Sequence, residues 1–134
     1  MSGTKRQCAR KLQGFLVPEK KYNTGEKSII RWFNLLNKLL FDEKLPQFNK
    51  IYIRKRNSTW AMCISQEKNG DYIHELRINT EFPTRRTFVN ILAHEMIHIN
   101  QYEFGERSGH GPSFWRWKPV FEKHGLILRE EYGY

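Results

Sequence analysis

Apolar residues recur at helical spacing between residues 25 and 46. Ile29, Phe33, Leu36 and Leu40 follow one another at intervals of three or four residues, which places them on one face of an α-helix. Pro46 cannot continue that helix, because proline has no amide hydrogen and its ring clashes with the preceding turn. The pattern therefore predicts an amphipathic helix that ends before Pro46.

The middle of the chain changes to the alternation of apolar and polar residues that is typical of strands. We expect strands in KIYIRKR, TWAMCIS and YIHELRIN, at residues 50–56, 59–65 and 72–79. The sequence Asn-Gly-Asp at residues 69–71 is a turn signal between the second and third stretches. Together they predict a small, mostly antiparallel sheet.

Helical spacing returns after Pro83, with a long helix expected from about Thr84 to Tyr102 and Gly105 as its stop signal. Residues 106–111 predict a loop. Pro112 suits the first turn of a last helix, which carries Phe114, Trp117 and Phe121 and should kink or break at Pro119. The order helix, small sheet, helix, helix predicts one α+β domain.

The long helix carries the stretch LAHEMIHINQ, with His94, Glu95 and His98 in an HExxH pattern. Each residue of a helix advances by about 100°, so His94 and His98 lie about 40° apart on one flank. Two imidazoles so placed can share a metal ion. Glu95 falls within the apolar arc of the helix, where a carboxylate needs a compensating group such as a metal with its water. The alternative is an ordinary helix whose two histidines are structural.

Zinc needs a third protein ligand and an open position for water. His110 is the candidate, because Gly109 and Gly111 on either side let the backbone turn the imidazole back towards the helix. Glu103 and Glu106 are the rivals. Two further histidines are expected outside the site, in a strand and in the last helix: His74 and His124.

The pairing of LAHEMIHINQ with the downstream GHGPSFW resembles the SprT-like family of zinc metalloproteases, to which Spartan belongs. LLFDEKLP at residues 39–46 is also similar to that family. The resemblance covers roughly residues 24–125. It implies a small zincin-like fold, one Zn²⁺ per chain bound by His94, His98 and His110, and Glu95 as catalytic base. The best-known members degrade proteins crosslinked to DNA and are stimulated by DNA.

The composition adds a strong positive charge. Lys and Arg number 23 against 14 Asp and Glu, which gives a net charge of +9 and favours an anionic partner, nucleic acid first. We expect a basic arm at residues 1–23 ahead of the protease domain at 24–134, and binding of single-stranded DNA in preference to duplex. Candidate contacts are Arg54, Lys55 and Arg56, with Tyr52 beside them, and Arg85 and Arg86 at the start of the metal helix.

The sequence also limits the setting of the protein. Cys8 and Cys63 are the only cysteines, so neither a disulfide framework nor a cysteine zinc ribbon is expected. No apolar run approaches the length of a membrane span, and no membrane partner is expected. We expect a monomer in the cytoplasm, of the host cell if the source is viral, or in the nucleus if it is eukaryotic.

The expected reaction is hydrolysis of a protein substrate's peptide bonds. A further group should stabilise the oxyanion, and the candidates are Tyr102, Arg107, Tyr132 and Tyr134. Residues 72–79 are our guess for the sheet edge that pairs with substrate. Two other functions stay open: a zinc protease without nucleic-acid dependence, for example in virus assembly, and a nucleic-acid-binding module with a structural zinc.

Overall fold

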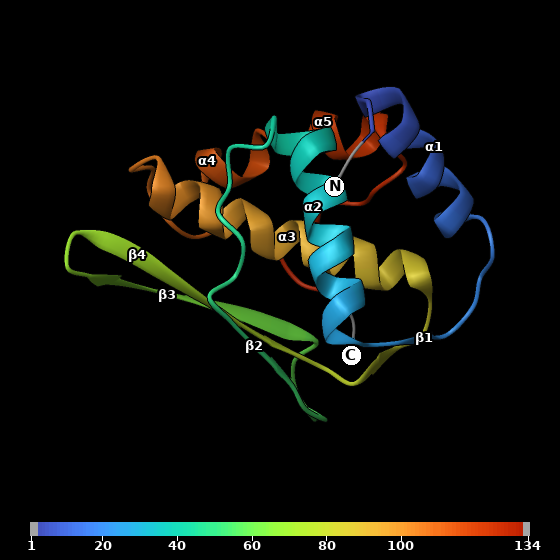
Figure 1. The fold of residues 1–134 in the computed structure, drawn as a ribbon, viewed down its shortest axis with the longest axis horizontal. Coiled ribbons are helices and arrows are strands. Elements are labelled where there is room, and N and C mark those ends of the chain that lie inside the picture. Colours follow the sequence, from blue (N-terminus) through green and yellow to red (C-terminus); the bar gives the residue numbers. More distant parts are fainter. Residues whose placement is uncertain (1–2, 133–134) are drawn as a thin grey trace.

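A computed structural model describes residues 3–132 of the chain (Figure 1). The helices are α1 (Lys5–Leu16), α2 (Glu26–Phe41), α3 (Arg85–Glu103), α4 (Pro112–Trp115) and α5 (Lys118–Lys123). The strands are β1 (Tyr22–Asn23), β2 (Lys50–Ile53), β3 (Ala61–Lys68), β4 (Asp71–Ile78) and β5 (Glu81–Phe82). The fold is the expected α+β arrangement, with α3 lying between the helical layer and the sheet.

The main sheet has the strand order β2-β4-β3. Strands β3 and β4 form the antiparallel hairpin that the Asn-Gly-Asp turn predicted, whereas β2 pairs with β4 in parallel. Strand β4 therefore lies in the centre of the sheet. The guess that residues 72–79 form an edge for substrate is wrong for residues 75–78, which pair with β2 on one side and with β3 on the other, whereas residues 71–74 have ladder partners in β3 alone. The outer edges of the sheet belong to β2 and β3.

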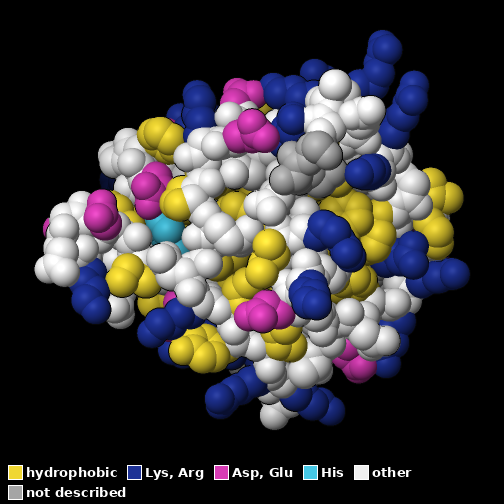
Figure 2. All heavy atoms as spheres, in the orientation of Figure 1, with side chains coloured by type: hydrophobic (Ala, Val, Ile, Leu, Met, Phe, Trp, Pro, Cys, Tyr) yellow, Lys and Arg dark blue, Asp and Glu magenta, His cyan; other side chains and the backbone are white. Residues whose placement is uncertain are grey.

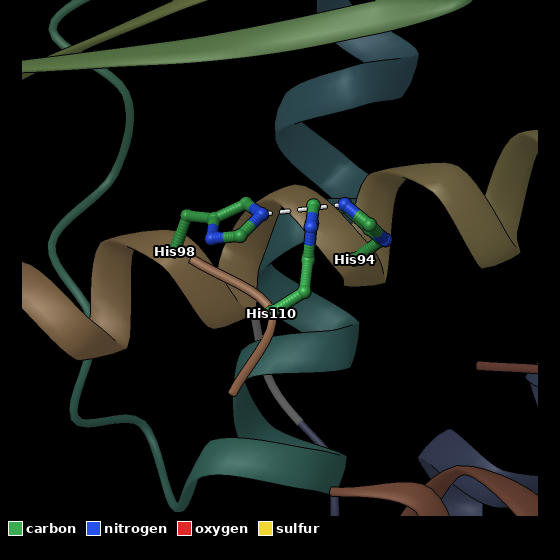
Figure 3. Close-up of side chains that lie close together, drawn as sticks. All are labelled: His94, His98 and His110. Atoms are coloured by element: carbon green, nitrogen blue, oxygen red, sulfur yellow. Dashed lines mark hydrogen bonds between the residues drawn. The ribbon is translucent and has the colours of Figure 1, made fainter. Parts of the chain in front are cut away.

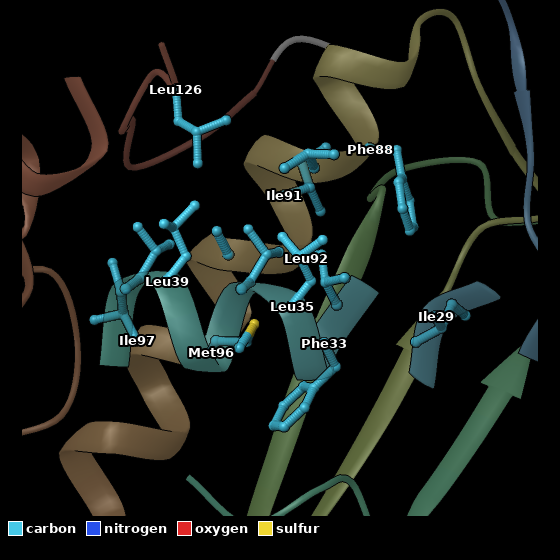
Figure 4. Packing of buried hydrophobic residues seen from close by; sticks show 14 of the residues in the cluster. Ile29, Phe33, Leu35, Leu39, Phe88, Ile91, Leu92, Met96, Ile97 and Leu126 are labelled. Carbon is cyan, nitrogen blue, oxygen red and sulfur yellow. The ribbon is translucent and has the colours of Figure 1, made fainter. Parts of the chain in front are cut away.

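Helix α3 is the most deeply buried element of the domain. Its middle is covered on nearly every side. The residues of the predicted apolar arc are buried, and so are four residues outside that arc: Val89, Ala93, Ile97 and Asn100. Figure 4 shows side chains of α2 and α3 packed against each other, with Leu126 from the C-terminal segment closing the cluster. A helix enclosed in this way gives fixed positions to the side chains that it directs into a site.

Within the expected basic arm, residues 5–16 form a packed helix that the sequence pattern did not lead us to predict. Thr4 caps α1, and a capping box with Gln7 satisfies the first amides of the helix. Cys8, Leu12 and Leu16 are buried at intervals of four residues. The basic side chains of α1 lie on its other face, which is exposed.

The predicted last helix is divided into two short helices, and the break falls a few residues before Pro119. Helix α4 ends at Trp115, and Pro119 lies in the first turn of α5, where proline is tolerated. Beyond α5 the chain runs back across the domain, with Leu126 and Leu128 buried. This segment, residues 126–132, is called the C-terminal strap below, because it passes over the histidines of α3.

Candidate metal centre and active site

Helix α3 and the loop after it bring three imidazoles together. His94 and His98 are one turn apart on α3, and His110 comes from the loop, where Gly109 adopts a φ of 105°. One ligand nitrogen from each ring lies within 4.8 Å of the others. Figure 3 shows the three rings facing a common point.

The protonation of two of these rings is fixed by their partners. His94 Nδ1 lies 3.0 Å from the carbonyl oxygen of Arg129, and His98 Nδ1 lies 2.9 Å from Gln101 Oε1. Both partners accept hydrogen bonds, so each Nδ1 must carry the proton. Each Nε2 is therefore left with its lone pair.

These two lone pairs face each other. His94 Nε2 and His98 Nε2 are 3.3 Å apart, and the dashed line in Figure 3 joins them. Two nitrogens that each bind a tetrahedral zinc at about 2.05 Å are about 3.3 Å apart. The distance is unfavourable for two bare lone pairs and suits a shared cation.

The remaining contacts of the three rings also favour a bound cation. His110 Nε2 is buried without a hydrogen-bond partner among the described residues, while its Nδ1 lies 3.3 Å from Glu130 Oε1. Burial, together with the neighbouring imidazoles, lowers the pKa of His94 to about 3, and burial lowers the pKa of His98. Neutral imidazoles with free nitrogens are the form that binds a metal, so the residues present fit a divalent cation.

Gln101 links the histidines of α3 with the loop that carries His110. Its side chain is fully buried, and while Oε1 accepts from His98, Nε2 donates to Gly109 O and to Ser113 Oγ, each at 2.9 Å. One amide therefore orients a ligand on α3 and holds the loop that carries His110.

Glu95 lies beside the histidines, with Oε2 at 3.8 Å from His94 Nε2. Burial raises the pKa of its carboxyl to about 8, and a hydrogen bond from the backbone amide of Cys63 acts in the opposite direction. That amide points away from β4, because it is bonded to Glu95. The carboxyl therefore lies next to the free edge of β3.

The rivals for the third ligand position are bound elsewhere. Glu103 Oε2 accepts from the buried His74 Nε2 at 2.6 Å, so both residues belong to a contact between α3 and β4. Glu106 bonds with Arg116 at 2.5 Å. Burial raises the pKa of Cys63 to about 12, so that this thiol stays protonated and does not act as a thiolate ligand.

A pocket of about 210 Å³ opens onto His94 and Glu95, and we call it the catalytic pocket. Its walls come from the chain before and at the start of β3, from α3 and from the strap: Ser58, Thr59, Trp60, Ala61, Ile91, Glu130, Glu131 and Tyr132. Among the proposed oxyanion donors only Tyr132 lines this pocket, where its hydroxyl donates to Ile127 O at 2.7 Å. Tyr102 packs against Tyr72 of β4 in a tilted arrangement, with ring centroids 5.5 Å apart, and Tyr134 lies outside the described residues.

The candidate nucleic-acid contacts separate into two groups. Arg54 and Arg56 line a pocket of about 350 Å³ on the outer face of the sheet with Tyr52 and Arg77. Arg85 instead stacks on Phe15, with its guanidinium carbon 4.8 Å from the ring centroid.

Arg86 donates a hydrogen bond to Gly125 O. Both arginines at the start of α3 are therefore occupied within the domain, which weakens their assignment to phosphate. Figure 2 shows Lys and Arg side chains projecting around the outline of one face, with acidic side chains scattered between them.

The residues that sequence reasoning missed are the partners of the ligands. The sequence could have indicated Gln101 as a partner of His98, because it lies three residues later and therefore on the same side of the helix. The sequence gives no such indication for Arg129 and Glu130, since only the folded chain brings the strap to α3.

An α+β domain in which a helical HExxH pair and a histidine from the following loop converge beside a buried glutamate is a zincin-like domain. A model of the SprT-like family matches residues 29–125, and the chain belongs to that family. A search of the curated proteins finds no match. No helix among residues 3–132 combines the length and apolar character needed to span a bilayer.

Proposed function

We propose that this protein is a zinc metallopeptidase that hydrolyses peptide bonds and acts in association with nucleic acid. The observation that carries the proposal is the pair of Nε2 lone pairs 3.3 Å apart, with the His110 nitrogen and the Glu95 carboxyl beside them. A structural zinc is usually closed by four protein ligands and needs no base. Here three nitrogens converge, and Glu95 and an open pocket occupy the remaining side.

Zinc held by these three histidines would lower the pKa of a water towards about 7 and polarise the scissile carbonyl. Glu95 then has the role of general base, taking a proton from that water at Oε2 and passing it to the leaving amine. Its side chain is largely buried where it lines the catalytic pocket, and the Cys63 amide holds the carboxyl in place. Tyr132 is the nearest candidate for stabilising the oxyanion, after its hydroxyl leaves Ile127 O.

The free edge of β3 is the proposed binding site for the substrate backbone. It runs beside Glu95 and leads out of the catalytic pocket at Ala61. An extended peptide can add to such an edge through main-chain hydrogen bonds. The edge of β3 replaces β4 as the proposed substrate site, because the second half of β4 is paired on both sides.

Association with nucleic acid is supported by the charge and by the outer face of the sheet. Tyr52 is 40% exposed beside Arg54, Arg56 and Arg77, which combines a stacking ring with cations as single-strand binders do. Binding through phosphates should weaken steeply with salt. It should show little preference for base sequence, because contacts to phosphates carry no sequence information.

The deciding experiment measures cleavage of an unfolded protein by the zinc-loaded wild type and by Glu95→Gln, each with and without single-stranded DNA. Cleavage by the wild type alone, increased by DNA, is the expected result. Cleavage that DNA leaves unchanged would favour the protease without nucleic-acid dependence. DNA binding with no cleavage by the wild type would favour the module with a structural zinc.

A further inference from the structure

A second, larger pocket adjoins the catalytic pocket. It has a volume of about 530 Å³, and its lining comes from the chain ahead of β1, the loop after β2 and the β4–β5 region: Lys21, Lys55, Arg56, Asn57, Trp60, Asn79, Thr80, Glu81, Phe82 and Pro83. Trp60 lines both pockets. We call the larger one the basic pocket.

The charge of the basic pocket is positive. Lys21, Lys55 and Arg56 face a single acid, Glu81, whose Oε2 lies 2.7 Å from Lys21 Nζ. Lys55 and Arg56 have no salt bridge among the described residues. The two are left to attract an anion from outside the chain.

The pocket is also built in a way that suits a carboxylate. Arg56 is held by a hydrogen bond from Nε to Thr59 Oγ1 at 3.0 Å and by one from Asn79 Nδ2 to its carbonyl oxygen at 3.0 Å. A guanidinium oriented in this way loses little freedom when it binds a carboxylate. Trp60 and Phe82 stack with ring centroids 5.2 Å apart and offer an apolar wall to the methylene groups of a side chain.

The position of the pocket relates it to the proposed substrate path. Cys63, the residue bonded to Glu95, lies three residues after Trp60 along the chain, and an extended strand advances about 3.3 Å per residue. A peptide paired with β3 beside Glu95 therefore passes Trp60 a few residues from the bond that is cut.

We propose that the basic pocket is a substrate subsite that binds an acidic side chain of the peptide, at a fixed offset on one side of the scissile bond. This inference rests on the proposed peptidase function. The carboxylate lies between Lys55 and Arg56, and the stem of the side chain packs on Trp60. The catalytic pocket itself is lined by Glu130 and Glu131, so the two adjoining pockets favour side chains of opposite charge.

The test uses zinc-loaded Glu95→Gln protein and two fluorescent peptides of equal length, both built from Ala, Ser and Gly, one with Glu and one with Gln at alternate positions. Fluorescence anisotropy should show about tenfold tighter binding of the Glu peptide, the scale of a charge-assisted hydrogen bond. Replacing Lys55 and Arg56 together by Gln should abolish that preference. The control replaces Arg54 and Arg77 by Gln, which removes the same charge from the outer face of the sheet and should leave the preference intact.

Three results would overturn the proposal. The wild-type pocket could show no preference for the Glu peptide, or both double variants could lose the preference equally, which would make it an effect of net charge. Alternatively, single-stranded DNA binding could depend on Lys55 and Arg56 more than on Arg54 and Arg77 while the peptide preference is missing, which would make the pocket a nucleic-acid contact.

A cleavage map separates this inference from the proposed function. Cut sites of the wild type in an unfolded protein, identified by mass spectrometry, should carry Asp or Glu at one constant position. Cleavage without that position would refute the subsite and leave the peptidase intact. A Glu-peptide preference in a protein that cuts nothing would keep the pocket as an acidic-peptide site and refute the peptidase.

Discussion

Replacing Gln101 by Ala should weaken zinc binding while His94, His98 and His110 all remain. The substitution removes the acceptor for His98 Nδ1 and the donor to Gly109 O and Ser113 Oγ. Partners of metal ligands typically contribute 10- to 100-fold in metal affinity, or about 1.4 to 2.7 kcal/mol. Because Gln101 acts on a ligand and on the loop that carries another, we expect the upper part of that range.

The fold should also lose stability in the metal-free state. Ser113 Oγ keeps its bond to Arg107 O, so two groups, His98 Nδ1 and Gly109 O, are left without their partner. A fully buried polar group without a partner costs about 1 to 3 kcal/mol, and these two groups are only part-buried. The expected loss is therefore about 2 kcal/mol, the low end for two such groups, in the free energy of unfolding measured with a chelator present.

The assay is competition for zinc with a chromophoric chelator, alongside urea unfolding of the metal-free protein. Asn100→Ala is the matched control, since Asn100 is the neighbouring buried amide and its side chain bonds with Glu106, away from the ligands. Gln101→Glu keeps an acceptor for His98 but turns a carboxylate oxygen towards Gly109 O, and it should also weaken binding. Wild-type zinc affinity in Gln101→Ala would refute the reasoning.

Four further outcomes are expected. Glu95→Gln should keep its zinc, measured by metal analysis, while cleavage falls by at least about a hundredfold, and near wild-type cleavage would contradict the mechanism. His110→Ala should lose zinc whereas Glu103→Ala should keep it; the reverse would make Glu103 the ligand. In metal-free protein the Glu95 carboxyl has a pKa of about 8, against an ordinary value of 4.5. The folded state therefore holds a proton that the unfolded state has released, so stability should fall as the pH rises from 7 to 8, by up to about 1.4 kcal/mol per pH unit. Urea unfolding should show that slope in the wild type and not in Glu95→Gln; an unchanged slope would contradict it. Leu12→Ala should cost about 2 to 5 kcal/mol in urea unfolding, as a core residue does, and a loss near zero would mean that α1 is a detachable arm.

The HExxH pair could be predicted because a helix converts sequence spacing into direction. His94 and His98 are fixed on one flank by the geometry of α3 alone. His110 needed one further step, the turn allowed by its flanking glycines, and the structure brings it to the other two. The prediction of a single buried arc on α3 was wrong, because burial depends on how many neighbours surround the helix, and spacing contains no information about that.

The N-terminal helix was missed although a signal was present. The cations among residues 5–11 favour an exposed basic segment. Cys8, Leu12 and Leu16, however, repeat every four residues, which predicts the buried stripe of a helix. Deleting residues 1–20 is consequently a poor test of nucleic-acid binding, since it removes part of the core together with the charge. Neutralising the exposed Arg6, Arg10 and Lys11 separates the two effects.

The proposed metal centre depends on residues outside the part of the chain that the family model matches. The family match ends at residue 125, yet Arg129 O holds His94 and the Glu130 carboxylate lies 3.3 Å from His110 Nδ1. Two of the three rings are therefore oriented by the strap, which is in turn fixed by the burial of Leu126 and Leu128. Since a bound metal stabilises whatever arrangement presents its ligands, zinc binding and docking of the strap should reinforce each other. In the proposed site the motif supplies the candidate ligands, and the strap holds two of them in the orientation in which they could bind a metal.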